Sequence, residues 1–219
     1  MHPQACAPEY FLSSKMRASP RRRFMNTDNV LHQRAGRVEV ITGCMFGGKT
    51  EELIRLLRRT SIARQKLIVF KHANDSGRYD PVQLASHCGG RLMATPVHTV
   101  AHMRQLVTDD IEVVGIDEGQ FFEEELVGFV RWLRLTGRRV IVVILNQTFT
   151  GDPFPGPGSA LLAIADNITL LTAVCSVCGE PAGFSQRLTG GKDVVQVGEK
   201  KDYDARCILH WNPDGAPTE

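Results

Sequence analysis

Residues 43–50 read Gly-Cys-Met-Phe-Gly-Gly-Lys-Thr, which satisfies the phosphate-loop pattern G-x-x-x-x-G-K-[ST]. Glycines in such a loop let successive backbone N–H groups turn inward and form a nest for an anion. In this pattern Lys49 reaches the β- and γ-phosphates of a nucleoside triphosphate, and the hydroxyl of Thr50 ligates Mg²⁺. The octapeptide predicts a phosphate site; the alternative is a glycine-rich turn with a solvent-exposed lysine.

The segments on either side of this loop supply the setting that it needs. The run from Val38 to Thr42 is β-rich and short, and a helical pattern of apolar residues begins after Thr50, at Leu53, Ile54, Leu56 and Leu57. A helix that starts at the loop directs the positive end of its dipole at the phosphates. We therefore expect a strand, the loop and a helix in succession.

Beyond this unit, apolar strand-like runs alternate with helical patterns. These segments lie at 66–70, 98–107, 113–117, 123–135, 140–145 and 159–165. Continuously apolar strands that alternate with helices are typical of a parallel sheet covered on both faces. The sequence therefore predicts an α/β protein with a RecA-like P-loop fold, a parallel sheet flanked by helices.

An acidic pair follows the strand-like run at 113–117, which ends at Asp117 and is followed directly by Glu118. Ligands of open parallel sheets bind at the carboxyl ends of the strands. We therefore expect Asp117 near the phosphate loop, where it would hold Mg²⁺ through water. Glu118 could act as a base toward water, as in an ATPase, or toward a bound hydroxyl, as in a kinase; the alternative is that it only caps the next helix.

Four residues near the C-terminus have the spacing of a metal site. Cys175-Ser-Val-Cys178 and Cys207-Ile-Leu-His210 are two pairs, each with two intervening residues. Three thiolates and one imidazole suit a closed tetrahedral Zn²⁺ site. Four protein ligands leave no open position, so this zinc is predicted to be structural, and it would stabilise a domain too small for a large core.

Composition and charge divide the chain into four parts. Residues 1–36 are polar and basic and are expected to form a disordered arm. We expect a nucleotide-binding domain at 37–169, a zinc-ribbon-like lasso domain at 170–211 and a tail at 212–219. The formal net charge of the 219 residues is +2. This balance favours no nucleic-acid partner. The longest strongly apolar run, Val140 to Leu145, is far shorter than the ~20 residues of a membrane span. The cysteine pattern fits a reducing compartment such as the cytoplasm.

Several runs together resemble the cytosolic-type thymidine kinases. They read Gly-Cys-Met-Phe-Gly-Gly-Lys-Thr at 43–50, Asp-Glu-Gly-Gln-Phe-Phe at 117–122, Leu-Thr-Ala-Val-Cys-Ser-Val-Cys at 171–178 and Asp-Tyr-Asp-Ala-Arg-Cys at 202–207. The resemblance extends over about 37–211, in order. It implies an ATP-dependent transfer of phosphate to the 5′-hydroxyl of thymidine, giving thymidine monophosphate in pyrimidine deoxynucleotide salvage.

The resemblance also implies roles for individual residues. Glu118 matches the general base. The ATP-binding segments are matched by Gly43, Cys44, Met45, Phe46, Gly47, Gly48, Lys49, Thr50, Asp117, Glu118, Gly119 and Gln120. The substrate-binding residues are matched by Phe149, which packs on the thymine ring, and by Val194, Val195, Gln196, Val197, Gly198 and Tyr203 in a closing loop. The zinc ligands are matched by Cys175, Cys178, Cys207 and His210. Family members are usually homotetramers that the end product dTTP inhibits.

The chain departs from the family's usual residues at a few positions. Cys44 stands where the family usually has Pro, Gly47 where it usually has Ser, and Asn146 where it usually has Asp. The loop at 75–79 also has an extra residue. Two other classes of function fit the residues less well. An ATPase that acts on nucleic acid would need a basic stripe on residues 170–211, where acidic residues offset the basic ones. A non-catalytic nucleotide-binding scaffold would not need Lys49, Thr50, Asp117 and Glu118 together.

Overall fold

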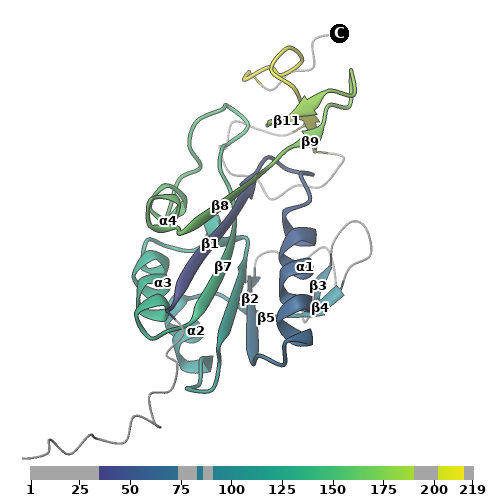
Figure 1. The fold of residues 1–219 in the computed structure, drawn as a ribbon. Helices are drawn as coiled ribbons and strands as arrows, with labels where there is room; N and C mark the ends of the chain where they lie inside the picture. Colours follow the sequence, from purple (N-terminus) through teal and green to yellow (C-terminus); the bar gives the residue numbers. More distant parts are fainter. Residues whose placement is uncertain (1–34, 74–82, 86–90, 190–201, 215–219) are drawn as a thin grey trace, which may run out of the picture. The chain divides into compact units, whose positions relative to one another are not determined.

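A central sheet of six parallel strands, in the order β5-β2-β6-β7-β1-β8, organises the protein (Figure 1). The structure, a computed structural model, describes residues 35–73, 83–85, 91–189 and 202–214. The six strands are β1 (Arg37–Gly43), β2 (Leu67–His72), β5 (Thr95–Val97), β6 (Val113–Asp117), β7 (Arg139–Leu145) and β8 (Asn167–Leu171). The strand that precedes the phosphate loop, β1, and the strand that ends at Asp117, β6, are separated by β7 alone.

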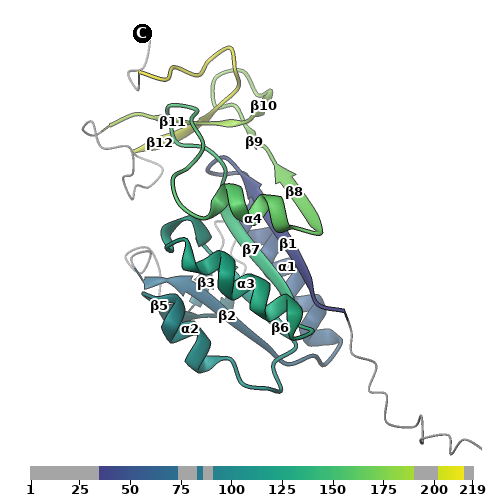
Figure 2. The ribbon, with the colours of Figure 1, turned by 90° about the vertical axis from the view of Figure 1, so that its left-hand side faces the viewer.

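Helices cover both faces of this sheet. They are α1 (Lys49–Ile62), α2 (Val100–Leu106), α3 (Glu125–Leu135) and α4 (Gly158–Ile164), and a short 3₁₀ helix, η3, covers Gly119–Phe121. Helix α1 lies on one face of the sheet, and the other three α-helices lie on the opposite face (Figures 1 and 2). The predicted parallel α/β architecture is thus confirmed.

The two faces are built from alternating residues of the same strands. In β7, Val140, Val142 and Ile144 pack into the core beneath α3, whereas Ile141 and Val143 pack against α1. All five are essentially inaccessible to solvent. Because successive side chains of a strand point to opposite faces, a strand covered on both sides must be apolar throughout. This explains why the run at 140–145 lacks any polar residue.

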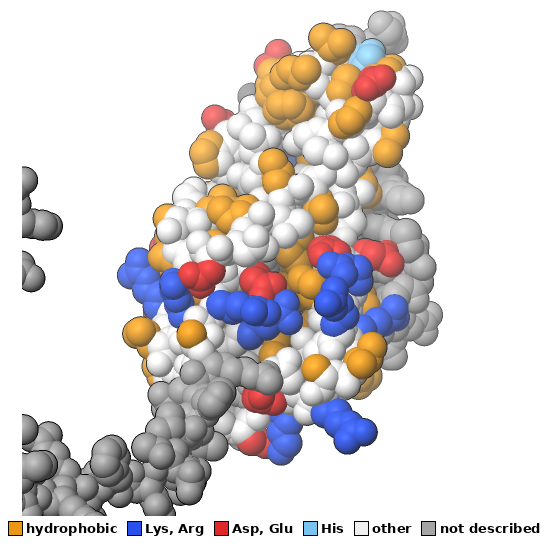
Figure 3. Space-filling view, viewed as in Figure 1, with side chains coloured by type: hydrophobic (Ala, Val, Ile, Leu, Met, Phe, Trp, Pro, Cys, Tyr) orange, Lys and Arg blue, Asp and Glu red, His pale blue; other side chains and the backbone are white. Residues whose placement is uncertain are grey.

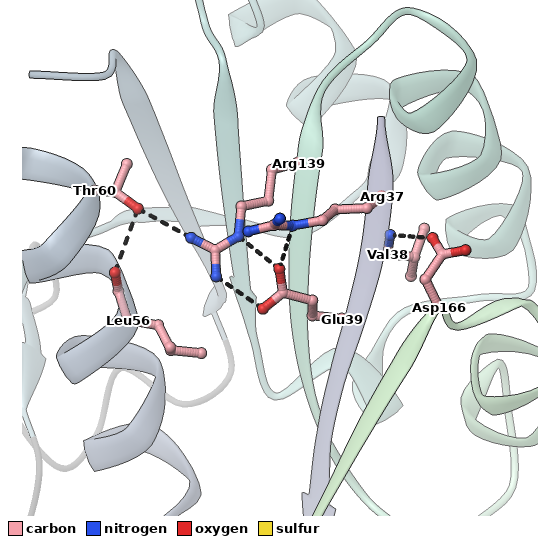
Figure 4. Close-up of polar contacts among 7 residues, drawn as sticks. All are labelled: Arg37, Val38, Glu39, Leu56, Thr60, Arg139 and Asp166. Carbon is pink, nitrogen blue, oxygen red and sulfur yellow. Dashed lines mark hydrogen bonds and ion pairs between the residues drawn. The ribbon is translucent and has the colours of Figure 1, made fainter. Parts of the chain in front are cut away.

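A network of charged groups ties β1 to β7 in the amino-terminal half of these strands (Figure 4). The Arg139 guanidinium donates to both carboxylate oxygens of Glu39, at 2.6 and 2.8 Å, and to the Thr60 hydroxyl on α1 at 3.3 Å. Arg37 donates a further hydrogen bond to Glu39 at 2.7 Å. The network therefore joins two strands and a helix at a distance along β1 from the phosphate loop.

Two small antiparallel pairs make up a C-terminal module, defined here as the described residues from 172 to 214. Strand β9 (Ala173–Val174) pairs with β10 (Pro181–Ala182), and β11 (Phe184–Arg187) pairs with β12 (Tyr203–Arg206). Hydrophobic side chains gather at this end of the face shown in Figure 3. The exposed ones include Val174, Val177, Ile208 and Leu209. A third pair, β3 (Gln83–Ala85) with β4 (Arg91–Met93), lies elsewhere in the chain.

The predicted strands and helices lie within about two residues of their observed bounds, but two strands of the sheet were not predicted. Strand β5 is only three residues long, and β8 is an edge strand whose Ile168 and Leu170 are exposed. Because β8 extends the main sheet through Leu171, the predicted domain boundary at 170 falls within a strand. The predicted arm lies almost entirely outside the described residues. Among the described residues, no helix is long and apolar enough to cross a membrane.

Candidate active site

The phosphate loop connects the end of β1 to the start of α1. Gly48, the residue before the helix, has φ +79° and ψ +19°. This left-handed conformation is strained for residues with a side chain but not for glycine. No side chain caps the start of α1, so the first N–H groups of the helix are left to bind an anion.

Lys49 is buried beneath the loop rather than exposed to solvent. Its ammonium group donates a hydrogen bond of 2.7 Å to the backbone oxygen of Cys44. Burial lowers the pKa of Lys49 from its ordinary value, and the nearby Glu118, Cys44 and Asp117 partly oppose this shift. The lysine thus lies within electrostatic reach of both acidic residues, in a site where a phosphate would supply the counter-charge.

The side chains predicted to hold Mg²⁺ are in contact. The Thr50 hydroxyl donates to Oδ2 of the buried Asp117 at 3.2 Å, and Oδ1 of Asp117 accepts from the backbone N–H of Glu118 at 3.1 Å. Neighbouring oxygen ligands of an octahedral Mg²⁺ ion, each about 2.0–2.1 Å from the metal, lie about 2.9 Å apart. The Thr50 and Asp117 oxygens, 3.2 Å apart, lie close to this spacing and would suit the ion.

Glu118 has an unusual backbone and a well-defined side-chain partner. Its φ and ψ are +53° and +41°, a left-handed conformation that costs a non-glycine residue about 1 kcal/mol or more. The Gln120 amide donates to Oε2 of Glu118 at 2.5 Å, and the Gln120 oxygen accepts from the N–H of Leu145 at 3.0 Å. The Glu118 side chain caps no helix, so the structure removes the capping alternative.

The loop that follows β7 packs against the acidic segment. Phe121 and Phe154 meet edge to face with their ring centroids 6.1 Å apart. The N–H of Phe154 donates to the backbone oxygen of Asn146 at 3.0 Å, which folds this loop back on itself. Asn146, where the family usually has Asp, has a buried Oδ1 for which the described residues supply no hydrogen-bond partner. Phe149 belongs to the same loop.

The C-terminal module contacts the phosphate loop directly. The Ser185 hydroxyl accepts from the N–H of Met45 at 3.0 Å, and the thiol of Cys44 donates to the backbone oxygen of Ala182 at 3.2 Å. Cys44 packs into one buried cluster with Cys175 and Cys207. The module therefore supports the wall of the nucleotide site.

The four predicted metal ligands come together in this module. The ligand atoms of Cys175, Cys178, Cys207 and His210 all lie within 4.8 Å of one another. Cys178 Sγ and Cys207 Sγ are 3.7 Å apart, and Nδ1 of His210 is 3.8 Å from Cys175 Sγ and 3.2 Å from Cys207 Sγ. A tetrahedral Zn²⁺ with its usual bond lengths places two sulfurs about 3.8 Å apart and a sulfur and a nitrogen about 3.6 Å apart. The donor set and its spacing fit zinc.

The thiols of this cluster differ in their electrostatics: the hydrogen bond from Glu180 lowers the pKa of Cys178, but burial and the hydrogen bonds with Cys175 and Cys207 outweigh it and raise that pKa. Burial by itself would raise the pKa of the Cys175 thiol, but N–H groups of Cys207, Cys178 and Val177 lower it to about 6. Thiolates are the form that binds zinc. No disulfide joins any of the four cysteines among the described residues.

The predicted substrate residues fall into two groups. Phe149 and Tyr203 are described: Phe149 is half-buried and Tyr203 is 6% exposed. Val194, Val195, Gln196, Val197 and Gly198, with the loop at 75–79, lie outside the described residues. No sequence pattern pointed to Arg187 or Trp211, which contact Phe149, because an isolated arginine and an isolated tryptophan match no motif.

A strand, a phosphate loop and a helix, with a buried aspartate at the end of a parallel strand two positions away in the same sheet, define a P-loop nucleotide-binding protein of the α/β class. The family model described as thymidine kinase matches residues 36–211. A thymidine kinase of Bdellovibrio bacteriovorus is 44% identical over 195 residues, which cover 89% of this chain and 94% of that protein. One from Coprothermobacter proteolyticus is 47% identical over 186 residues, which cover 82% and 92%. The chain belongs to the thymidine kinase family.

Proposed function

We propose that this protein transfers the γ-phosphoryl group of ATP to the 5′-hydroxyl of thymidine and so supplies thymidine monophosphate for DNA synthesis. Membership of the family supports the reaction. The observation that carries the proposal is the contact between Thr50 and Asp117, because it brings the phosphate loop and the acidic edge of the sheet to one site. Phosphoryl transfer depends mainly on positioning and on neutralising charge, and this site offers both.

The loop from Gly43 to Thr50 binds the triphosphate in this proposal. Its N–H groups and the Lys49 ammonium contact the β- and γ-phosphates and offset their negative charge. Thr50, together with Asp117 directly or through water, would hold Mg²⁺, which supplies additional positive charge to the phosphates. Gly119 and Gln120 complete the ATP-binding segment.

Glu118 acts as the general base that removes the proton of the 5′-hydroxyl. It follows Asp117 directly, lies within electrostatic reach of Lys49, and its carboxylate is oriented by Gln120. A general base must keep its carboxylate at a fixed place beside the reacting hydroxyl. The two carboxylates have different partners, Thr50 for Asp117 and Gln120 for Glu118, so one acid can serve the metal and the other the nucleoside.

Phe149 and Tyr203 contribute the wall that receives the nucleoside. A flat thymine ring stacks favourably on an aromatic face. The zinc ion at Cys175, Cys178, Cys207 and His210 is structural. We extend the proposal to a cytoplasmic homotetramer that dTTP inhibits, as is usual in the family.

Phosphorylation of a nucleoside panel with ATP tests this function. ADP release that depends on thymidine is expected, whereas release that depends on DNA would indicate a nucleic-acid ATPase. Absence of both would indicate a scaffold. Size-exclusion chromatography with light scattering tests the assembly, and metal analysis tests the zinc.

A further inference from the structure

The aromatic ring of Phe149 is covered by an arginine from the C-terminal module. The Cζ atom of Arg187, on β11, lies 3.9 Å from the centroid of this ring. Arg187 is only 3% exposed. A guanidinium that stacks on an aromatic face out of water forms one of the stronger cation–π contacts. Arg187 therefore stabilises one orientation of the Phe149 ring.

The same guanidinium also holds Tyr203. Its Nη2 donates a hydrogen bond of 3.0 Å to the Tyr203 hydroxyl, and its Cζ lies 5.6 Å from the centroid of that ring. The two aromatic residues come from different parts of the chain, one from the loop after β7 and one from the start of β12. Arg187 thus links them through a single planar group.

A second contact from the module fixes the backbone of Phe149. The indole N–H of Trp211 donates to the Phe149 carbonyl oxygen at 3.0 Å. The Trp211 ring stacks on Phe184, with centroids 4.4 Å apart and an interplanar angle of 18°. Gly151 has φ +83°, and a Cβ added there would lie 2.7 Å from Cη2 of Trp211. The glycine leaves room for the indole to reach the Phe149 loop.

The polypeptide around Trp211 is itself anchored. The N–H of Asn212 donates to Gln186 Oε1 at 2.6 Å, and Gln186 Nε2 donates back to the Asn212 backbone oxygen at 3.0 Å. Gln186 directly precedes Arg187 on β11, and Trp211 directly follows His210. The two side chains that contact Phe149 therefore belong to one rigid part of the module.

We propose that Arg187 and Trp211 are positioning residues for nucleoside binding: they clamp Phe149, and Arg187 also orients Tyr203, so that the C-terminal module sets the wall on which the base stacks. This inference rests on the proposed function, in which Phe149 and Tyr203 contact the nucleoside. A freely rotating phenyl ring would have to be ordered when the base binds, at a cost in affinity. The clamp imposes that order before the nucleoside arrives.

The clamp acts on one substrate and not on the other. The hydrogen bonds of the module with the phosphate loop involve Ala182 and Ser185, which the clamp does not use. Loosening Phe149 should therefore raise KM for thymidine and leave KM for ATP nearly unchanged. A general loss of folding would instead lower the active fraction and reduce kcat.

Arg187→Lys is the main variant, because it keeps the charge and loses the planar group that can stack and donate together. We expect KM for thymidine to rise about tenfold and KM for ATP to change less than twofold. Arg206→Lys is the matched control: Arg206 lies on the adjacent strand β12, pairs with Asp204 at 2.9 Å, and makes none of the clamp contacts described above. Its KM values should match those of the wild type.

Trp211→Phe tests the other contact independently, since it keeps an aromatic ring for Phe184 while it loses the N–H together with one ring of the indole. KM for thymidine should rise about threefold, again without a change for ATP. A double-mutant cycle of Arg187→Lys with Phe149→Leu completes the test. If Arg187 acts through Phe149, its substitution should have little further effect in the Phe149→Leu background.

The outcomes separate the two proposals. A wild-type enzyme that phosphorylates thymidine, with KM unchanged in both Arg187→Lys and Trp211→Phe, would overturn the clamp and leave the proposed function standing. Additive effects in the cycle would also overturn it, because Arg187 would then act without Phe149. A wild-type enzyme that phosphorylates no nucleoside would end both. If Arg187→Lys binds less zinc than the wild type, Trp211→Phe alone decides the matter.

Discussion

The side-chain amide of Gln120 donates a 2.5 Å hydrogen bond to the carboxylate of Glu118, and its oxygen accepts from the N–H of Leu145 at 3.0 Å. Gln120 is 3% exposed. One buried amide therefore connects the proposed base to the end of the strand beside the phosphate loop. The Gln120 amide is itself bonded to β7, so the position of the Glu118 carboxylate is fixed by the sheet.

Replacing this amide tests its effect on the base. Gln120→Met keeps the volume and removes both hydrogen bonds. We expect kcat to fall about tenfold, and the free energy of unfolding to fall by about 1–3 kcal/mol because the N–H of Leu145 loses its partner. Steady-state kinetics and urea unfolding measure the two effects. A variant with wild-type kcat and reduced stability would show that Gln120 supports the fold alone.

The role of Glu118 can be tested with its amide. Glu118→Gln preserves size and removes the basic group, so kcat should fall by roughly 10²–10⁴, the usual contribution of a general base. Thymidine and ATP should still bind with nearly wild-type dissociation constants in calorimetry. Near-normal turnover would assign the proton transfer to another group.

The Glu39–Arg139 pair should make stability depend on acid. Burial by itself raises the pKa of Glu39, but hydrogen bonds and charge from Arg139, and then Arg37, outweigh it and lower the pKa below 4.5. A carboxyl with a depressed folded-state pKa contributes stability that is complete above the unfolded value and is lost as pH falls through the folded value. Glu39→Gln should therefore lower the free energy of unfolding by about 1–3 kcal/mol at pH 7.

This difference between Glu39→Gln and the wild type should narrow as the pH falls below about 4.5. Urea unfolding at a series of pH values provides the measurement, with kinetics at pH 7 as the control for the site. A difference that stays constant from pH 7 to pH 3 would show that the charge of Glu39 contributes nothing.

Removal of one metal ligand should affect the whole C-terminal module. Cys178→Ser is expected to lower zinc content and to reduce the melting temperature, because a small module depends on its metal for stability. KM for thymidine should rise as well, since Arg187 and Trp211 belong to this module. Metal analysis and thermal unfolding are the direct measurements. Unchanged zinc content and melting temperature would contradict the metal assignment.

The parts of the structure that the sequence predicted are those with strong local rules. The phosphate loop needs particular glycines, and strands such as β6 and β7, buried on both faces, must be apolar throughout. The metal ligands occur in two pairs, each with two intervening residues, and this spacing can be recognised in the sequence. The Asp117–Glu118 pair could be placed because ligands of parallel sheets gather at the strand ends.

The unpredicted parts depend on long-range contacts. Strand β8 lies at the edge of the sheet and exposes Ile168 and Leu170, so its pattern resembles neither a buried strand nor a clean alternation. Arg187 looks like any surface arginine in sequence. Its burial depends on Phe149, which lies 38 positions earlier along the chain. No local sequence pattern predicts a contact between two residues so far apart.

The hydrogen bonds from Cys44 and Met45 to the C-terminal module have a thermodynamic consequence. If metal binding fixes the positions of Ala182 and Ser185, it also stabilises the conformation of the phosphate loop. Linkage then requires that ATP binding and zinc binding strengthen each other by the same factor. ATP should then slow the release of zinc to a chelator by the same coupling through which zinc tightens ATP. In a cell short of zinc, such a protein would bind both ATP and the nucleoside with lower affinity.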